Sequence, residues 1–356
     1  MRRLPDRDIE RIQDFSAEAA LSLPSYALEK DHHVLEAMRL IVKAPPNPNF
    51  RLVFCGGTCL SKAYGALERM SEDVDFKVVP TTAGAALSRT KRREALRAFG
   101  EMIAATLEQG SFGEGNVART ARDENAYTRL DVTYESAFEK PDALRSHLLI
   151  ELNLTPLAVP TKQRSIGLLL DKLIGGAYVG AFSIECVGLP EALAEKLVSF
   201  PRRLAAHRAR HGHNPALLGD ERLWDRALVR HLYDVHQLAA TRPELLADAA
   251  ALGRLVAAVI AKDQRDFANQ HPEFVADPRA EIEAALAHAK ASPDLSAQYA
   301  VFVQDMVYSV PENIPTYEQA LGAFESILIQ ALAALDVQLA QEASAVARQA
   351  LRGPAM

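Results

Sequence analysis

Two glycines followed by a threonine form the first motif that could bind phosphate. Gly56, Gly57 and Thr58 lie between a strand-like run, Phe50–Cys55, and a helical run that continues past Lys62. Glycines let backbone amides approach an anion closely, and the free amides at a helix N-terminus attract negative charge. Thr58 is suited to capping the first helical turn. A glycine pair alone is usually an ordinary turn. With the motif that follows, however, it leads us to expect nucleotide contacts from this turn and from Lys62.

Two aspartates follow shortly downstream, with one residue between them. Side chains alternate in the strand-like run after Ser71, so Asp73 and Asp75 point to one face while Val74 and Phe76 point to the core. Two neighbouring carboxylates repel each other, and a hard divalent ion such as Mg²⁺ or Mn²⁺ suits their oxygens. The second motif therefore predicts a metal site beside the nucleotide, with Ser71 as a further nucleotide contact.

A third acid is expected to complete the metal cage or to accept a proton from the acceptor hydroxyl. Glu151 lies at the centre of the strand-like run Leu148–Leu154, where alternation directs it away from the apolar face. Asp131, in the strand-like run Arg129–Tyr134, is the alternative. A single charge in a strand is often only solvent-facing. Glu151 is the prediction, and the residues alone leave Asp131 open.

These motifs need a sheet to hold them, and the pattern supplies one in the first half of the chain. The first fifty residues read as helical up to the proline-rich run Ala44–Asn49, and strands then alternate with helices predicted at Thr58–Arg69 and Ala85–Gln109. Beyond Pro160 the pattern is almost wholly helical, including Pro190–Arg210, Glu221–Ala240, Glu244–Val259, Arg279–Lys290, Asp294–Val307 and Tyr317–Leu351. The predicted class is α+β: a domain with a small mixed sheet over residues 1–160 and a mainly helical domain over residues 161–356.

Composition is that of a globular cytoplasmic protein. The 356 residues are 49% hydrophobic and 24% charged, with a formal net charge of −6 that argues against indiscriminate coating of nucleic acid. The N-terminus has no continuous apolar stretch, and no later run is expected to span a membrane. Three cysteines give no disulfide framework and fit a reducing compartment.

Several ordered stretches resemble the AbiEii/AbiGii-type nucleotidyltransferases. They are Leu28–Val34, Phe54–Tyr64, Arg69–Phe76, Leu189–Leu197, Arg230–Val235 and Asp305–Tyr308. The resemblance spans nearly the whole chain. It implies a polymerase-β-like nucleotidyltransferase domain, a helical C-terminal region, and activity as the toxin of a type IV toxin–antitoxin system.

The resemblance also implies roles for residues far apart in the sequence. Besides the glycine turn and the two aspartates, it adds Lys196 and Asp234, the residues of the two later motifs. Lys196 flanks the apolar stripe of a predicted helix, where its ammonium could bind a triphosphate, and Arg202 or Arg203 could bind a phosphate further along, with Arg203 as the predicted contact. Pro201 is expected to interrupt that helix. Two departures stand out: Cys55 replaces a basic residue that many relatives carry, and His231 replaces an acidic one.

The function expected from these motifs is transfer of a nucleoside monophosphate from an NTP to an acceptor. The acceptor would be tRNA or another RNA end, and the partner an antitoxin encoded nearby. Two alternatives remain open at this point. One is nucleotidylation of a small molecule such as an antibiotic, and the other is a non-catalytic module that only binds NTP.

Overall fold

The computed structural model describes residues 1–18, 23–141, 144–176, 180–213, 225, 227–268 and 272–351. The chain forms two compact units. The first comprises Met1–Gly188 together with the short segment Asp305–Val310, and the second comprises Leu189–Gln304 and Pro311–Met356. The first unit thus extends to Gly188, whereas the sequence placed the domain boundary at residue 160.

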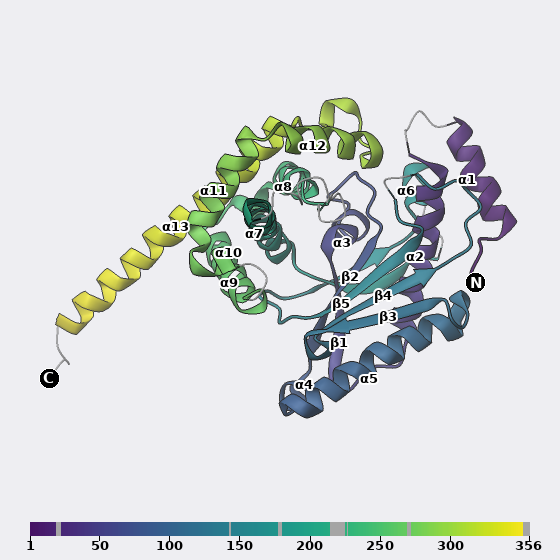
Figure 1. The fold of residues 1–356 in the computed structure, drawn as a ribbon, viewed down its shortest axis with the longest axis horizontal. Helices are drawn as coiled ribbons and strands as arrows, with labels where there is room; N and C mark the ends of the chain where they lie inside the picture. The colour runs from purple at the N-terminus through teal and green to yellow at the C-terminus, as the bar shows by residue number, and fades with distance from the viewer. Residues whose placement is uncertain are drawn as a thin grey trace. The chain divides into compact units, whose positions relative to one another are not determined.

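The first unit is built on a seven-stranded mixed sheet in the order β3-β4-β5-β2-β1-β7-β6 (Figure 1). Strand β2 pairs antiparallel with β1 and parallel with β5. The strands are β1 Phe50–Cys55, β2 Asp73–Pro80, β3 Val117–Arg122, β4 Tyr127–Thr133, β5 His147–Leu154, β6 Lys162–Ile166 and β7 Phe182–Cys186. The accompanying helices are α1 Asp6–Glu18, α2 Ser25–Lys43, α3 Gly56–Lys62, α4 Thr82–Ala85, α5 Arg89–Leu107 and α6 Leu169–Leu173.

One face of the central strands is apolar and buried. It carries Val74 and Phe76 of β2, Ile150 of β5 and Leu130 of β4, all at most 1% exposed. Helix α2 packs against β5 and α5 packs against β3, so these two helices supply the other side of the core. The alternation predicted for β2 and β5 therefore holds, and the polar members of these strands point to the opposite face.

Three strands were missed from the sequence, and the helix after the glycine turn is shorter than predicted. Strands β3 and β6 are the two edges of the sheet, and β7 lies between β6 and β1. β3 and β6 carry little apolar signal, whereas β7, which buries Ile184 and Cys186, is only five residues long. Helix α3 ends at Lys62 instead of Arg69, because Gly65 takes a left-handed φ of +58° that turns the chain.

A distant segment returns to the first unit. The amide of Met70 donates to the carbonyl of Met306 over 2.7 Å, and the amide of Tyr308 donates to the carbonyl of Glu68 over 3.0 Å. Arg69 and Val307 form the antiparallel bridge between them. The residues that precede the Asp73 motif are therefore held by a part of the chain more than two hundred positions away.

The second unit is helical, as predicted. Its helices are α7 Leu189–His213, α8 Arg230–Thr241, α9 Ala249–Asp266, α10 Pro272–Ala276, α11 Pro278–Ala291, α12 Pro293–Met306 and α13 Tyr317–Leu351. The expectation that Pro201 interrupts its helix is wrong, because α7 continues through it. Phe200 and Leu204 on either side are buried, and their packing offsets the hydrogen bond that a proline removes.

One segment of the second unit is longer and more apolar than expected. Pro311–Gln341 is long and apolar enough, by length and composition alone, to cross a membrane, which corrects the prediction that no segment reaches that length. Helix α13, which begins within this segment, packs against α8 and α9 and buries Phe324 and Leu328. A core helix of a bundle has the same composition, so the feature is weak evidence for a membrane.

Candidate active site

The glycine turn is required by a close approach of the aspartate strand. Gly56 has φ of +73°, and a Cβ atom placed on it would lie 2.0 Å from Oδ2 of Asp75. This proximity follows from the pairing of β1 with β2, in which Cys55 is opposite Asp75. Any side chain at position 56 would therefore displace the carboxylate and adopt an unfavourable backbone conformation.

Gly57 makes room for a second polar group. A Cβ atom on Gly57 would lie 2.5 Å from Nη2 of Arg69 and 3.1 Å from Oγ of Ser71. Arg69 is 3% exposed, and its Nη1 donates to the carbonyl of Met70 over 3.0 Å. The two glycines therefore bring an aspartate and an arginine to adjacent positions on one turn.

Thr58 joins the two motifs but does not cap the helix. Helix α3 already begins at Gly56, so the predicted capping role of Thr58 is wrong. The buried hydroxyl of Thr58 instead hydrogen-bonds the carbonyl of Asp73 and lies 2.9 Å from Oγ of Ser71. It ties the glycine turn to the start of β2.

Three of the predicted acids lie on the same face of neighbouring strands. Asp73 and Asp75 are two residues apart on β2, and Asp75 is the register partner of Glu151 on β5. Neighbouring strands are separated by about 4.8 Å, so Asp75 and Glu151 are side by side. Asp131, the alternative third acid, lies on β4, one strand further away, opposite Leu149.

Glu151 and Asp131, the two candidates for the third acid, each already have a protein partner. The Tyr127 hydroxyl donates to Oε1 of Glu151. Burial, and then this hydrogen bond, raise the pKa of Tyr127 above its usual range, so Tyr127 remains a donor. Asp131 is bound by the guanidinium of Arg129, with Nη2 at 2.7 Å from Oδ1, and His147 lies 3.0 Å from the same oxygen. Asp131 is therefore occupied by its own network, away from Asp75.

Asp73 is paired with a guanidinium. Nη1 of Arg145 contacts Oδ1 of Asp73 and lies 3.5 Å from Oε1 of Glu72. Within the described ranges, no group of three His, Cys, Asp or Glu side chains is arranged to hold a metal ion. The oxygen chemistry of Asp73, Asp75 and Glu151 nevertheless suits a hard divalent cation, which would have to take the place of Arg145 on Asp73.

Three consecutive charged residues of α2 support this face from within the core. Glu29, Lys30 and Asp31 are each at most 3% exposed. Glu29 accepts a hydrogen bond from the amide of Ala137 over 2.8 Å. Asp31 accepts one from the amide of Leu169 over 2.7 Å. The triplet thus joins α2 to separate segments of the unit.

Lys30 is the member nearest the acids. Its ammonium lies 2.6 Å from Oε2 of Glu72 and 2.7 Å from the carbonyl of Arg145. Burial alone would raise the pKa of Glu72, but Lys30 and the amide of Arg145 outweigh it, so the net shift is downward. Because Glu72 directly precedes Asp73, this buried pair fixes where β2 begins.

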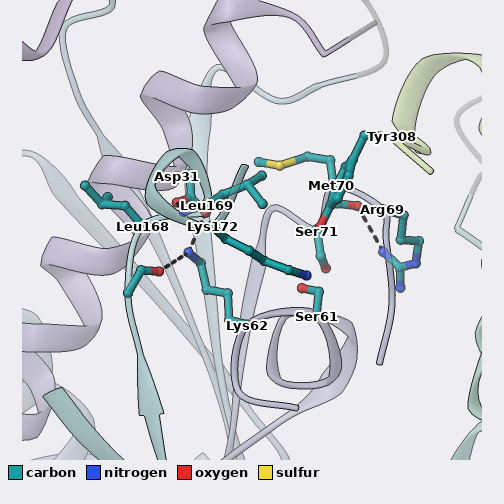
Figure 2. Close-up of a pocket in the computed structure, with 11 residues that line it drawn as sticks. Asp31, Ser61, Lys62, Arg69, Met70, Ser71, Leu168, Leu169, Lys172 and Tyr308 are labelled. Atoms are coloured by element: carbon teal, nitrogen blue, oxygen red, sulfur yellow. Dashed lines mark hydrogen bonds and ion pairs between the residues drawn. The ribbon is translucent and has the colours of Figure 1, made fainter. Parts of the chain in front are cut away.

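Lys62, predicted as a nucleotide contact, is held by protein groups. Its ammonium lies 2.5 Å from Oδ1 of Asp31 and donates to the carbonyl of Gly167 over 3.1 Å. It lines a pocket together with Ser71 and Arg69, as Figure 2 shows. Lys62 therefore contributes charge to the surroundings of the glycine turn from a fixed position.

The second unit brings together the two residues of the later motifs. Nζ of Lys196 on α7 lies 2.8 Å from Oδ2 of Asp234 on α8, and the side chain of Asp234 is fully buried. Arg203, predicted to bind phosphate, pairs with Asp225 and lies 3.1 Å from Nε2 of His231. Its guanidinium is thus held within the second unit.

Several polar residues around the acids were not predicted from the sequence as site residues. They are Lys30, Arg69, Glu72, Tyr127 and Arg145. Arg69 and Glu72 lie within the motif that carries the aspartates, so their position was a usable signal. Lys30 was part of a matching stretch without an assigned role. Tyr127 is 24 positions from Glu151 and Arg145 is 72 positions from Asp73, and pattern alone could not find these contacts.

Comparison with known proteins identifies the family. The family model described as nucleotidyl transferase AbiEii toxin, type IV TA system, matches residues 38–323. A solved structure of MenT4, a nucleotidyltransferase toxin from Mycobacterium tuberculosis H37Rv, matches with 17% identity and a TM-score of 0.49, covering 92% of this chain and 89% of that one. No curated protein sequence matches. Since the family model covers most of its length, the chain belongs to the AbiEii nucleotidyltransferase toxin family of type IV toxin–antitoxin systems.

Proposed function

We propose that this nucleotidyltransferase moves a nucleoside monophosphate from an NTP to the end of an RNA, with tRNA as the principal acceptor. The observation that carries the proposal is the row of carboxylates beside the glycine turn. Asp75 lies over Gly56 and opposite Glu151, and Asp73 is on the same strand face. Donor phosphates would bind beside Gly57 and Ser71, next to the cationic Arg69.

The chemistry follows from these positions. The acceptor hydroxyl oxygen forms a bond to the α-phosphorus, the bond from that phosphorus to the α–β bridging oxygen breaks, and pyrophosphate leaves. The hydroxyl proton passes to a carboxylate, for which Glu151 is the candidate, with Tyr127 holding it in place. Asp73 and Asp75, with Glu151, would hold Mg²⁺ or Mn²⁺, and the ion supplies neutralisation of the developing phosphate charge.

Two residues of the second unit complete the proposal. Lys196 is a candidate for contact with the donor phosphates, and Asp234 would orient its ammonium through their 2.8 Å ion pair. We place the reaction in the cytoplasm, where NTP and RNA are available. The cysteines Cys55, Cys59 and Cys186 are all free thiols, which is compatible with that compartment. Transfer to tRNA would arrest growth, and a cognate antitoxin would oppose it.

The test is incubation of the full chain with each α-labelled NTP, Mg²⁺ and total RNA. Asp75→Asn is expected to reduce label transfer at least about a hundredfold, because it removes charge stabilisation at the reacting phosphorus. Asp131→Asn is the matched control, since that carboxylate lies on the same sheet but is bound by Arg129. Undiminished transfer by Asp75→Asn would refute the assignment. Label in a low-molecular-weight product instead of RNA would favour a small-molecule acceptor, and NTP binding without transfer would favour a non-catalytic module.

A further inference from the structure

We propose that Lys172 binds the terminal phosphate of the donor triphosphate, in the pocket beside the glycine turn. This rests on the proposed function, because it takes an NTP as the donor, and it assigns a residue that the sequence motifs do not contain. The pocket is lined by side chains from α2, α3 and α6 and by Tyr308 of the returning segment Asp305–Val310. Figure 2 shows Lys172 reaching across it toward Ser61 and Ser71.

The charge of the pocket favours an anion. Three cationic side chains line it, Lys62, Arg69 and Lys172, against one carboxylate, Asp31. Asp31 is already engaged by Lys62 at 2.5 Å and by the amide of Leu169 at 2.7 Å. The remaining charge is therefore positive, and it is accompanied by hydroxyl groups that can donate to phosphate oxygens.

Lys172 differs from the other two cations in what it touches. Lys62 is held by Asp31 and Gly167, and Arg69 by the carbonyl of Met70. Within the described part of the chain, no hydrogen bond or ion pair engages the ammonium of Lys172. An ammonium that points into a pocket without a protein partner can bind an incoming oxyanion without first breaking an existing ion pair.

The backbone under Lys172 is anchored, so the residue is presented in a defined place. Leu169 at the start of α6 donates its amide to Asp31. Asp171, next to Lys172, is 1% exposed and accepts from Nη2 of Arg11 over 2.7 Å. These two contacts anchor the short helix, so that only the flexible stem of Lys172 must adjust when a ligand binds.

The position of the pocket indicates which part of the donor it would take. Arg69 and Ser71 line the pocket and also lie against Gly57. The α-phosphate must be near Asp75, whose carboxylate lies over Gly56. A chain of phosphates that begins at Asp75 and passes Gly57 would therefore enter the pocket with its far end, where Lys172 is.

The experiment uses inorganic tripolyphosphate and Mg²⁺ as a base-independent probe, with affinity measured by calorimetry on the full chain. Lys172→Gln is expected to weaken tripolyphosphate binding about tenfold, the loss typical of one charge-assisted hydrogen bond. Lys172→Arg is expected to stay within about threefold of the parent. Lys162→Gln, an exposed lysine on β6, is the matched control and is expected to bind normally.

A second measurement needs no variant. Bound tripolyphosphate is expected to protect Lys172 from an amine-reactive reagent, read by mass spectrometry, while Lys162 stays reactive. If the parent chain binds tripolyphosphate and transfers nucleotide, but Lys172→Gln binds equally well and Lys172 is not protected, the inference is wrong and the proposed function stands. If the parent binds neither tripolyphosphate nor any NTP, the proposed function itself fails.

Discussion

The two units each contain a lysine paired with a buried carboxylate, but the two pairs differ in what else holds the lysine. Lys30 is fully buried, and its ammonium also donates to the carbonyl of Arg145 and lies 5.9 Å from the ring centre of Tyr26. Lys196 keeps 13% of its side chain exposed while its ammonium pairs with Asp234. The first lysine is thus suited to holding segments in place, and the second can still reach a ligand.

The largest expected effect comes from breaking the first pair. Lys30→Met is expected to lower the free energy of unfolding by about 3–5 kcal/mol, because it leaves Glu72 charged and buried without its partner. Denaturant unfolding of the two proteins measures the loss. Adding Glu72→Gln to the variant is expected to recover part of it. A loss below about 1 kcal/mol would mean that Lys30 does not position the strand.

The second pair is expected to affect activity as well as stability. Lys196→Met should cost about 3–5 kcal/mol of stability, since the carboxylate of Asp234 is fully buried, and it should also reduce nucleotide transfer about a hundredfold. Thermal melts and the labelled-NTP assay measure the two quantities. Lys262→Met is the control, because Lys262 pairs with Asp266 at 2.9 Å in the same unit. Equal activity of both variants would remove the proposed role of Lys196.

Substitution of Arg145 tests which of the acids in the first unit binds a metal ion. Its side chain is 41% exposed, so Arg145→Gln should barely change stability, but it removes the guanidinium from Oδ1 of Asp73. Mn²⁺ binding in the absence of nucleotide is therefore expected to tighten about fivefold, as read by electron paramagnetic resonance. Arg129→Gln, which removes a guanidinium from Asp131 in the same way, should leave Mn²⁺ affinity unchanged. Tighter binding by Arg129→Gln would favour Asp131 as the metal ligand.

The smallest effect concerns another buried base on α2. Burial, reinforced by Arg2, lowers the pKa of His33 to about 2. The unfolded chain takes up a proton near pH 6.5 that folded His33 does not, so stability declines as the pH falls below that value. His33→Gln is expected to make the loss between pH 7.5 and 5.5 smaller by about 1.4 kcal/mol, measured by urea unfolding. An unchanged pH dependence would show that His33 does not cause it.

Local patterns predicted the apolar and polar faces of the central strands, because alternation in a half-buried strand depends only on neighbouring residues. Alternation alone was therefore enough to predict that Asp73, Asp75 and Glu151 point away from the apolar core. The edge strands β3 and β6 were not found, since their exposed residues carry little apolar signal, and the inner strand β7 was missed because a run of only five residues gives a weak pattern.

Long-range partners were beyond the reach of such patterns. That Arg145 contacts Asp73, that Lys30 contacts Glu72 and that Lys172 enters the pocket all depend on how distant segments meet. Thr58 illustrates the same limit at short range, since its hydroxyl bonds the carbonyl of Asp73 instead of capping its own helix. The family resemblance supplied Lys196 and Asp234, which composition and periodicity would not have joined.

The return of Asp305–Val310 to the first unit has a consequence for synthesis of the protein. This segment supplies the bridge to Arg69 and places Tyr308 in the pocket. When only the first 188 residues have emerged from the ribosome, every strand of the sheet has been synthesised, but the segment that forms this bridge has not. The surroundings of the glycine turn are completed only when most of the chain has emerged. A prematurely terminated product would therefore lack the bridge to Arg69 and the side chain of Tyr308 in the pocket.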